Sequence, residues 1–439
     1  MRALAIALWC LGLAAMTPPL AAQEFTTLKG HGGPIMGLAV NDQTGQVASA
    51  SFDNSVGLWQ GRAPHWLEGH RAAVISLEYL DETRLVSGGD DFALMIWDMQ
   101  TGTQTRLEGH KGKIAALDIS PDGQWIASAS WDGSIGIWPL AGGAPRFLTG
   151  HDAAVTDVMF GQTGALLYSS SSDGTVREWH WQEPQVRPRV VINQGFGVNR
   201  IILGPDDTWL AYGAVDGATR VIRPETGATL ADFTLDRRPI LALAHDPGRG
   251  QLAAGDGHGY IMVIDTDDWQ IERDFRAMQR GPVWALQFSP DGEMIYAGGL
   301  NDVVYGWPVA LLSEYDPAVA SEHSFLRAPR EMGNGERQFM RKCSICHALT
   351  PPPSRKAGPT LYGVFGRPAG TVPGYAYSEI LTGSDIIWSD DTIDALFDLG
   401  PDHYIPGSKM PMQRITAAQD RQDMIDYLRD ATAKQENRE

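Results

Sequence analysis

The sequence predicts a multidomain protein with a large all-β body and a smaller C-terminal domain of a different kind. The chain has 439 residues, which exceeds one average domain. A Gly-His pair recurs in its first part at intervals of 39 to 41 residues, each time followed by a tryptophan, whereas two of the three cysteines lie together in KCSICHALT (342–350). The 49 glycines and 14 tryptophans favour many short strands joined by turns.

Residues 1–22 are typical of a secretory signal peptide. Arg2 precedes an apolar run that ends at Met16, and two prolines and small residues follow up to Ala22. The run is shorter than the roughly 20 apolar residues of a spanning helix. We therefore expect cleavage near Ala22, export to the periplasm and no stable membrane insertion. A formal net charge of -18 argues against nucleic acid as a partner, because phosphate binding needs a basic surface.

Four units with the same pattern follow the leader. LKGHGGPI, LEGHRAAV, LEGHKGKI and LTGHDAAV each open a unit that ends in a tryptophan, with an aspartate six residues before it. The four histidines, aspartates and tryptophans are His31, His70, His110 and His151; Asp53, Asp91, Asp132 and Asp173; and Trp59, Trp97, Trp138 and Trp179. Three weaker units end at Ile222, Ile264 and Trp307, so we count seven.

This pattern resembles the WD40 repeat family, in which each unit is one four-stranded blade of a β-propeller. The resemblance implies a seven-bladed propeller over residues 23–313. It also implies that the histidine, a serine or threonine, the aspartate and the tryptophan of a unit form one hydrogen-bonded network. A ring of blades must close to remove its exposed edges. We therefore expect Glu24–Leu28 to pair as the outer strand of the seventh blade.

Residues 314–330 are predicted to be a linker and residues 331–439 a second domain. In an exported chain, CxxCH is the attachment motif of c-type haem. Cys343 and Cys346 would form thioethers to the haem, and His347 would ligate its iron. Two alternatives for these cysteines are a redox dithiol and half of a zinc site.

The segments GERQFMRKCSICHAL, GPTLYGVFGR, PGYAYS, IIWSDDT, YIPGSKM and QDMIDYLRDAT resemble class I cytochromes c of the mitochondrial type over residues 333–433. The resemblance implies a small all-α domain with one covalent haem c. It assigns the second axial ligand to Met410, with Met412 as the competitor, and assigns the carbonyl of Pro359 as acceptor from His347. Further matching positions are Arg367, Tyr377, Trp388 and Ser408 near the haem propionates, and Gly335, Phe339, Met424 and Tyr427 where the first and last helices cross.

The function predicted from these features is that of an exported c-type cytochrome. It would carry single electrons through one His/Met-ligated haem and dock redox partner proteins on the propeller or at the haem edge, with no catalytic residue assigned. Two alternatives remain open at this point. One is an enzyme whose propeller binds a substrate or second cofactor, with His245 and His258, expected in adjacent strands of the sixth repeat, as candidates. The other is a haem-based sensor that controls what the propeller binds.

Overall fold

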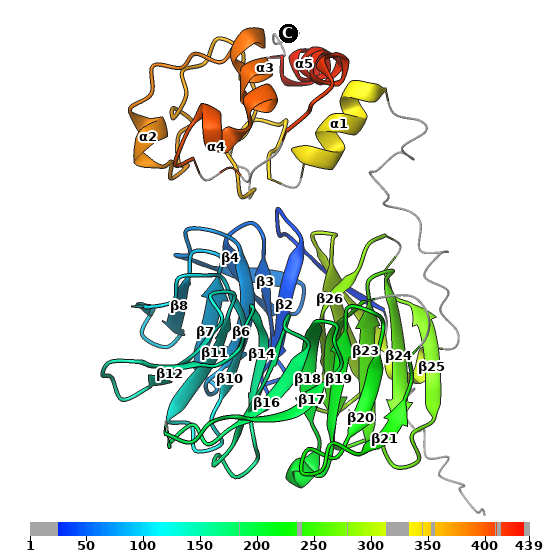
Figure 1. The fold of residues 1–439 in the computed structure, drawn as a ribbon. Coiled ribbons are helices and arrows are strands. Elements are labelled where there is room, and N and C mark those ends of the chain that lie inside the picture. Colours follow the sequence, from blue (N-terminus) through cyan, green and yellow to red (C-terminus); the bar gives the residue numbers. More distant parts are fainter. Residues whose placement is uncertain are drawn as a thin grey trace, which may run out of the picture.

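The computed structural model describes residues 25–183, 185–234, 239–278, 280–312, 333–344, 346–352, 356–408, 410 and 414–433. The predicted signal peptide (1–22) and linker (314–330) lie outside the described residues. The described chain forms a seven-bladed β-propeller followed by a small helical domain (Figure 1). This confirms the predicted fold class.

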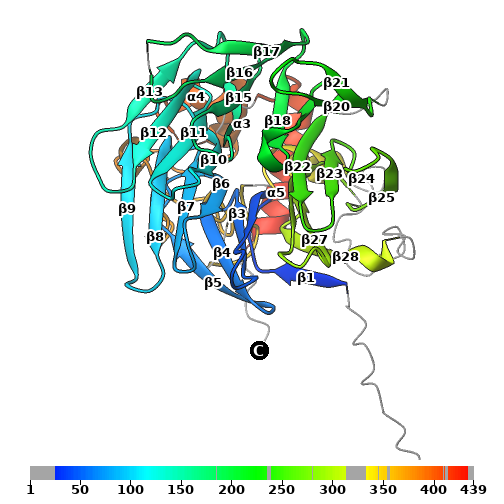
Figure 2. The same cartoon turned by 90° about the horizontal axis from the view of Figure 1, so that it is seen from below.

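Seven antiparallel four-stranded sheets surround one axis, as Figure 2 shows. The strands of blades 1 to 4 are β2 (Ile35–Val40), β3 (Val47–Ser51), β4 (Ser55–Gln60), β5 (Ala63–Glu68); β6 (Val74–Tyr79), β7 (Arg84–Gly89), β8 (Ala93–Asp98), β9 (Thr103–Glu108); β10 (Ile114–Ile119), β11 (Trp125–Ser130), β12 (Ser134–Pro139), β13 (Arg146–Thr149); and β14 (Val155–Phe160), β15 (Leu167–Ser171), β16 (Thr175–Trp179), β17 (Arg189–Asn193).

The three remaining blades are built from the weaker repeats. Their strands are β18 (Val198–Leu203), β19 (Leu210–Ala214), β20 (Thr219–Ile222), β21 (Thr229–Asp232); β22 (Ile240–Asp246), β23 (Gln251–Asp256), β24 (Tyr260–Asp265), β25 (Ile271–Arg276); and β26 (Val283–Phe288), β27 (Met294–Gly299), β28 (Val303–Pro308), with β1 (Thr26–Lys29). We call the face that carries the turn between the second and third strands of each blade the upper face; in blades 1 and 2 these turns are 52–54 and 90–92.

The first strand closes the ring. β1 pairs antiparallel with β28, with Thr26 opposite Gly306 and Leu28 opposite Val304. Leu28 is buried between blades 7 and 1. The expected closure is therefore confirmed, and the N-terminal and C-terminal ends of the propeller are held in one sheet, where neither leaves an open edge.

The predicted network is present in each of the four clear repeats. In blade 1, Trp59 Nε1 donates to Ser49 Oγ at 2.8 Å, and His31 lies between Ser49 (2.7 Å) and Asp53 (3.0 Å). A carboxylate only accepts, so Nδ1 of His31 donates to Asp53 and Nε2 accepts from the serine hydroxyl. The equivalent serines of blades 2, 3 and 4 are Ser87, Ser128 and Ser169. Each network ties the upper face of a blade to its third strand.

The hydrophobic cores lie between neighbouring blades. One cluster joins Ala48 and Leu58 of blade 1 to Leu77, Leu85 and Trp97 of blade 2. A single blade has two apolar faces that need such neighbours, so the propeller is stable only as a stacked ring.

The helical domain contains α1 (Asn334–Lys342), α2 (Glu379–Thr382), α3 (Asp390–Leu399), α4 (Pro401–Tyr404) and α5 (Ala418–Thr432). α1 crosses α5 at Gly335, where a Cβ atom would lie 1.9 Å from the carbonyl oxygen of Asp423. Only glycine permits this close approach. Phe339 and Tyr427 contact each other across the crossing with tilted rings whose centroids lie 5.6 Å apart, and Met424 is fully buried.

Local signals set the start of α3. Ser389 accepts a hydrogen bond from the backbone N–H of Thr392, and the Thr392 hydroxyl accepts one from Ser389 N–H at 2.7 Å, which forms a capping box. Ile393, Leu396 and Phe397 then turn toward the domain core. Within the described part of the chain, every helix is too short or too polar to cross a bilayer.

Candidate functional site

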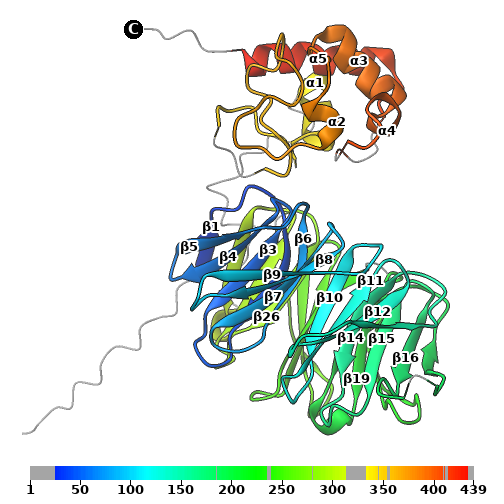
Figure 3. The same cartoon turned by 90° about the vertical axis from the view of Figure 1, so that its left-hand side faces the viewer.

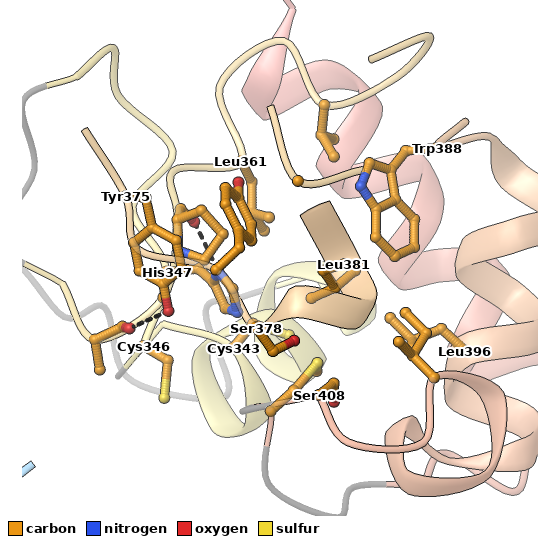
Figure 4. A pocket seen from close by; sticks show the side chains of 18 of the residues that line it. Cys343, Cys346, His347, Leu361, Tyr375, Ser378, Leu381, Trp388, Leu396 and Ser408 are labelled. Carbon is orange, nitrogen blue, oxygen red and sulfur yellow. Dashed lines mark hydrogen bonds between the residues drawn. The ribbon is translucent and has the colours of Figure 1, made fainter. Parts of the chain in front are cut away.

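One cavity contains every site residue predicted from the sequence. Its volume is about 210 Å³, and most of the residues that line it belong to the helical domain. The predicted residues that line it are Cys343, Cys346, His347, Pro359, Arg367, Tyr377, Trp388, Ser408 and Met410 (Figure 4). Residues from 343 to 410 thus meet around one space.

The CxxCH motif continues the helical path of α1 beyond its last residue. Cys343 N–H donates to Phe339 O at 2.8 Å, and His347 N–H donates to Cys343 O at 2.8 Å. The turn therefore presents two cysteines and a histidine to the same cavity. Both thiols are free, and burial raises the pKa of each, to about 12 for Cys343. Because Cys343 and Cys346 are not joined by a disulfide, both thiols beside the cavity can form thioethers.

His347 is oriented by a backbone acceptor. Its Nδ1 lies 2.7 Å from the carbonyl oxygen of Pro359, and Figure 4 shows this bond at the wall of the cavity. Nδ1 therefore carries the proton and Nε2 keeps its lone pair. Burial lowers the pKa of His347, which favours the neutral imidazole that a metal ion needs. The expected hydrogen bond to Pro359 is thus present.

Gly358 is a site residue that sequence reasoning missed. A Cβ atom at this position would lie 2.5 Å from Cε1 of His347. The backbone therefore approaches the imidazole face more closely than a side chain would allow. The glycine before Pro359 is visible in the sequence as part of Gly-Pro-Thr. Its role could not be inferred there, because it depends on where the imidazole of His347 lies in the folded domain.

The remaining wall of the cavity is mostly apolar. Met410 is half-buried and packs against the domain core. The competitor Met412 lies outside the described residues. The apolar lining residues are Leu361, Val364, Leu381, Leu396, Phe397, Ile405 and Leu428. Such a wall suits a large planar apolar group.

Polar groups without partners lie in the same cavity. The Ser378 and Ser408 hydroxyls are buried and, among the described residues, have no hydrogen-bond partner. Ser378 is the N-cap of α2, but its side chain makes no capping bond. Buried polar atoms are usually satisfied, so these two indicate a ligand with acceptor or donor atoms.

Arg367 adds a cation beside these hydroxyls. Its guanidinium donates to the carbonyls of Tyr362 and Thr360, at 2.8 Å each, and in the described chain no carboxylate forms an ion pair with it. A half-buried cation favours an anionic ligand. The cavity therefore fits a group that is flat and apolar over most of its area and carries carboxylates at one edge, as haem does.

Tyr377 and Trp388 also line the cavity, as expected. The Tyr377 hydroxyl accepts from Val372 N–H at 3.3 Å, so it retains a proton to donate. The neighbouring Tyr375, which was not predicted, donates to Ala357 O at 2.7 Å and packs on Tyr377. These contacts hold the segment after Val372 against the cavity.

The structure does not bring His245 and His258 together. His245 lies on β22 opposite Leu252 of β23. His258 lies beyond the other end of this strand pair, in the turn that follows Asp256, and Asp256 is opposite Ile240. Five strand residues, or roughly 17 Å, separate the two positions. The prediction that both lie in adjacent strands was wrong, because the repeat places a turn at residue 258. The described residues also contain no group of three metal-ligating side chains.

Comparisons with known proteins match both parts of the chain. The WD domain, G-beta repeat family matches residues 22–60, 61–98, 102–139, 144–180 and 271–307. Of the three weaker repeats, the one that ends at Trp307 is matched, whereas those that end at Ile222 and Ile264 are not. The cytochrome c family matches residues 333–432.

Several similar relatives are cytochromes c. That of Sesamum indicum is 42% identical over 107 residues, which cover 24% of this chain and 94% of the relative. That of Gossypium barbadense is 41% identical over 113 residues, or 25% of this chain and 99% of the relative. That of Theileria parva is 39% identical over 104 residues, which cover 24% of this chain and 89% of the relative. The similarity thus spans the whole helical domain.

Proposed function

Since the chain belongs to the cytochrome c family through residues 333–432 and carries WD40 repeats before them, we propose that it is an exported single-electron carrier whose propeller docks a redox partner protein. Family membership supports a covalently bound c-type haem and electron transfer. The repeats support protein interaction in general. We propose three further points: the identity of the iron ligands, the surface that binds the redox partner, and the export of the protein.

The hydrogen bond between His347 and Pro359 is the observation that carries the electron-transfer proposal. It fixes the tautomer in which Nε2 is the ligand atom. Cys343 and Cys346 would hold a single haem through thioethers, and His347 and Met410 would ligate its iron. When bound, the haem supplies an iron that gains and loses one electron, and a thioether ligand favours the reduced state.

The polar residues of the cavity would hold the carboxylates of the haem. Ser378 and Ser408 can donate hydroxyl protons, and Arg367 supplies a positive charge from a position fixed by two backbone carbonyls. Together they would offset the cost of placing propionates in a half-buried site. Trp388 and Tyr377 line the same space and can add donors.

The proposed docking surface is an arc of exposed apolar side chains on the upper face, which we call the apolar arc: Phe92, Trp131, Phe196 and Val215. Phe92 is 43% exposed, Trp131 55% and Phe196 56%. The four residues come from blades 2 to 5, and the blade that contains β16 extends past the helical domain in Figure 3. Exposed aromatic groups in succession are typical of protein contact surfaces.

Phe92 shows that this surface is retained against a backbone cost. It has a positive φ of 64°, and the equivalent positions in blades 3, 4 and 5 are Gly133, Gly174 and Gly217, all with positive φ. An aromatic residue is disfavoured in this region, and such strain concentrates at functional positions. A redox protein bound there would lie beside the haem domain, where tethering raises the effective concentration of the haem.

The ligand proposal is tested by visible spectroscopy of the purified holoprotein. We expect one haem per chain by pyridine haemochrome assay, a weak sulfur-to-iron band in the oxidised form, and no shift when carbon monoxide is added to the reduced form. Met410→Ala should remove the band and allow carbon monoxide to bind, whereas Met412→Ala should leave both unchanged. A rapid carbon monoxide shift in the unmutated protein would contradict a closed His/Met site.

The docking proposal is tested by reduction of the haem with a respiratory extract of the native host. Trp131→Ala with Phe196→Ala should slow reduction several-fold at an unchanged midpoint potential. Ile271→Ala, at an exposed position on the outer strand β25, is the control. Equal rates in all three proteins would show that the apolar arc is not the docking surface.

Export is tested on the mature protein. We expect the N-terminal residue of the haem-containing chain to be Gln23 and the protein to be recovered in the periplasmic fraction. An intact residue 1 on the haem-containing chain would contradict this proposal.

A further inference from the structure

The haem cavity is lined by residues of both domains. Besides the helical domain, it is bounded by upper-face residues of blades 1 and 2, and Figures 1 and 3 show the helical domain above this face. The propeller residues at the cavity are Phe52 and Asn54 in the β3–β4 turn, Arg71, Ala72 and Ala73 before β6, and Asp90 after β7. The propeller thus forms one wall of the cavity.

Opposite charges accompany this shared wall. Lys356 follows the CxxCH segment and is half-buried. Burial lowers the pKa of Lys356, and the carboxylates of Asp302 and Asp53 act in the opposite direction. Asp302 is in the β27–β28 turn of blade 7, whereas Asp53 is held inside blade 1 by His31 and Ser55. Asp302 is therefore the exposed carboxylate that acts on the amine of Lys356.

We propose that the upper-face turns of blades 1 and 2 are a docking site for the haem domain of the same chain, with the carboxylate of Asp302 on blade 7 attracting Lys356. In the docked state the propeller covers the mouth of the haem cavity on the Cys346 side. The inference about haem access rests on the proposed haem binding, but docking of the two domains does not. Because the contact combines a few apolar residues with one lysine facing acids, it is reversible and weakened by salt.

The covered mouth has a consequence for the haem. Small oxidants and reductants reach it slowly while the domains are docked, and faster when salt or a partner separates them. The two domains are parts of one chain, so even a weak contact is well populated. The propeller therefore protects the haem from non-specific electron exchange in addition to binding a partner.

A charge swap in the full-length holoprotein tests this arrangement. The variants are Lys356→Glu, Asp302→Lys and their combination, with Asp267→Lys on the opposite face of blade 6 as the matched control. The first readout is a zero-length carbodiimide cross-link between residues 356 and 302, mapped by mass spectrometry. The second is the rate at which an uncharged quinol reduces the ferric haem.

We expect the cross-link in the unmutated protein and in Asp267→Lys, with slow reduction that salt accelerates several-fold. Each single variant should lose the cross-link and be reduced several-fold faster, and the double variant should return to the slow rate. Equal rates in all variants, no cross-link, or a double variant that stays fast would overturn the proposal. Haem content is measured first, since a chain without haem contradicts the proposed function while the cross-link still reports docking.

Discussion

A half-buried carboxyl group on an inner strand of the propeller has an unusual acidity. Glu78, on β6, has a pKa raised from 4.5 to about 8, mainly by burial, with Asp118 and Asp42 adding repulsion. The folded protein therefore keeps a proton that the unfolded chain releases. Between pH 4.5 and about 8 the folded state binds more protons, so the free energy of unfolding falls as the pH rises.

Glu78→Gln should remove part of this decline. The amide keeps the shape but cannot ionise, so we expect the variant to be more stable than the unmutated protein at pH 8 by roughly 1–3 kcal/mol and similar at pH 4.5. Urea unfolding at both pH values measures this. Glu82→Gln, at an exposed turn position after β6, is the control. A variant that loses stability with pH as steeply as the unmutated protein would disprove the assignment.

Phe92 offers a separate test at the residue scale. Phe92→Gly relieves the positive φ, so we expect a gain of about 1 kcal/mol in the free energy of unfolding, together with slower reduction of the haem by the host extract. Asn54→Gly changes a residue that tolerates its φ of 72° and should alter stability less. Stability that falls in Phe92→Gly would show that the phenylalanine is held for packing instead.

At the scale of elements, the crossing of α1 and α5 depends on a single glycine. Alanine usually stabilises a helix interior relative to glycine. At position 335, however, the added methyl group would meet the backbone of α5, and the helices would have to separate. The crossing also positions Cys343, which packs near Met424 with their sulfur atoms 4.0 Å apart.

We therefore expect Gly335→Ala to destabilise the helical domain by roughly 1–3 kcal/mol, as overpacking does. Thermal unfolding followed by haem absorbance measures the change. Gly333→Ala is the matched control, because no atom lies within 4 Å of the Cβ position there. If both variants unfold at the same temperature, the crossing is looser than the structure shows.

The blades illustrate which elements local pattern can predict. The histidine, aspartate and tryptophan of a clear repeat predict where its strands lie. Strand β1 was expected because the ring closes only when β28 has a partner. Blades 5 and 6 lack most of these residues but form the same sheets. Their strands are held by packing between blades, as where Ile240 of blade 6 shares a hydrophobic cluster with Ala211 of blade 5.

At the scale of the whole molecule, the two domains have separate cores. The hydrophobic cluster of the helical domain contains residues 339 to 428, whereas those of the propeller end at residue 312. The haem would fill the centre of the first cluster and link Cys343, His347 and Met410. Loss of the haem should therefore affect one domain only.

Cys343→Ala combined with Cys346→Ala should remove the covalent haem. We expect calorimetry to show a propeller transition at an unchanged temperature, and a helical-domain transition that is lost or lowered by many degrees, because a bound group stabilises only the domain that holds it. Ser344→Ala, in the same motif, should retain the haem and both transitions. A propeller transition that shifts equally would indicate one cooperative unit.

The sequence by itself determined the parts that depend on short spacings. Seven repeats, the CxxCH turn, Pro359 as the acceptor for His347, and the cavity position of Met410 all follow from patterns within a few tens of residues or from family resemblance. Such features were predictable because each unit carries its own turn residues, strand alternation and buried polar partners.

Only the tertiary structure decided the contacts between distant segments. Phe52 and Arg71 line a cavity whose other wall begins nearly 300 residues later, and the carboxylate of Asp302 in one domain acts on the pKa of Lys356 in the other. The burial of Glu78 and the closeness of Gly358 to His347 likewise depend on neighbours that no local pattern specifies. Spacing sets the local fold of each unit, but solvent exclusion and charge pairing between units arise only when the chain has packed.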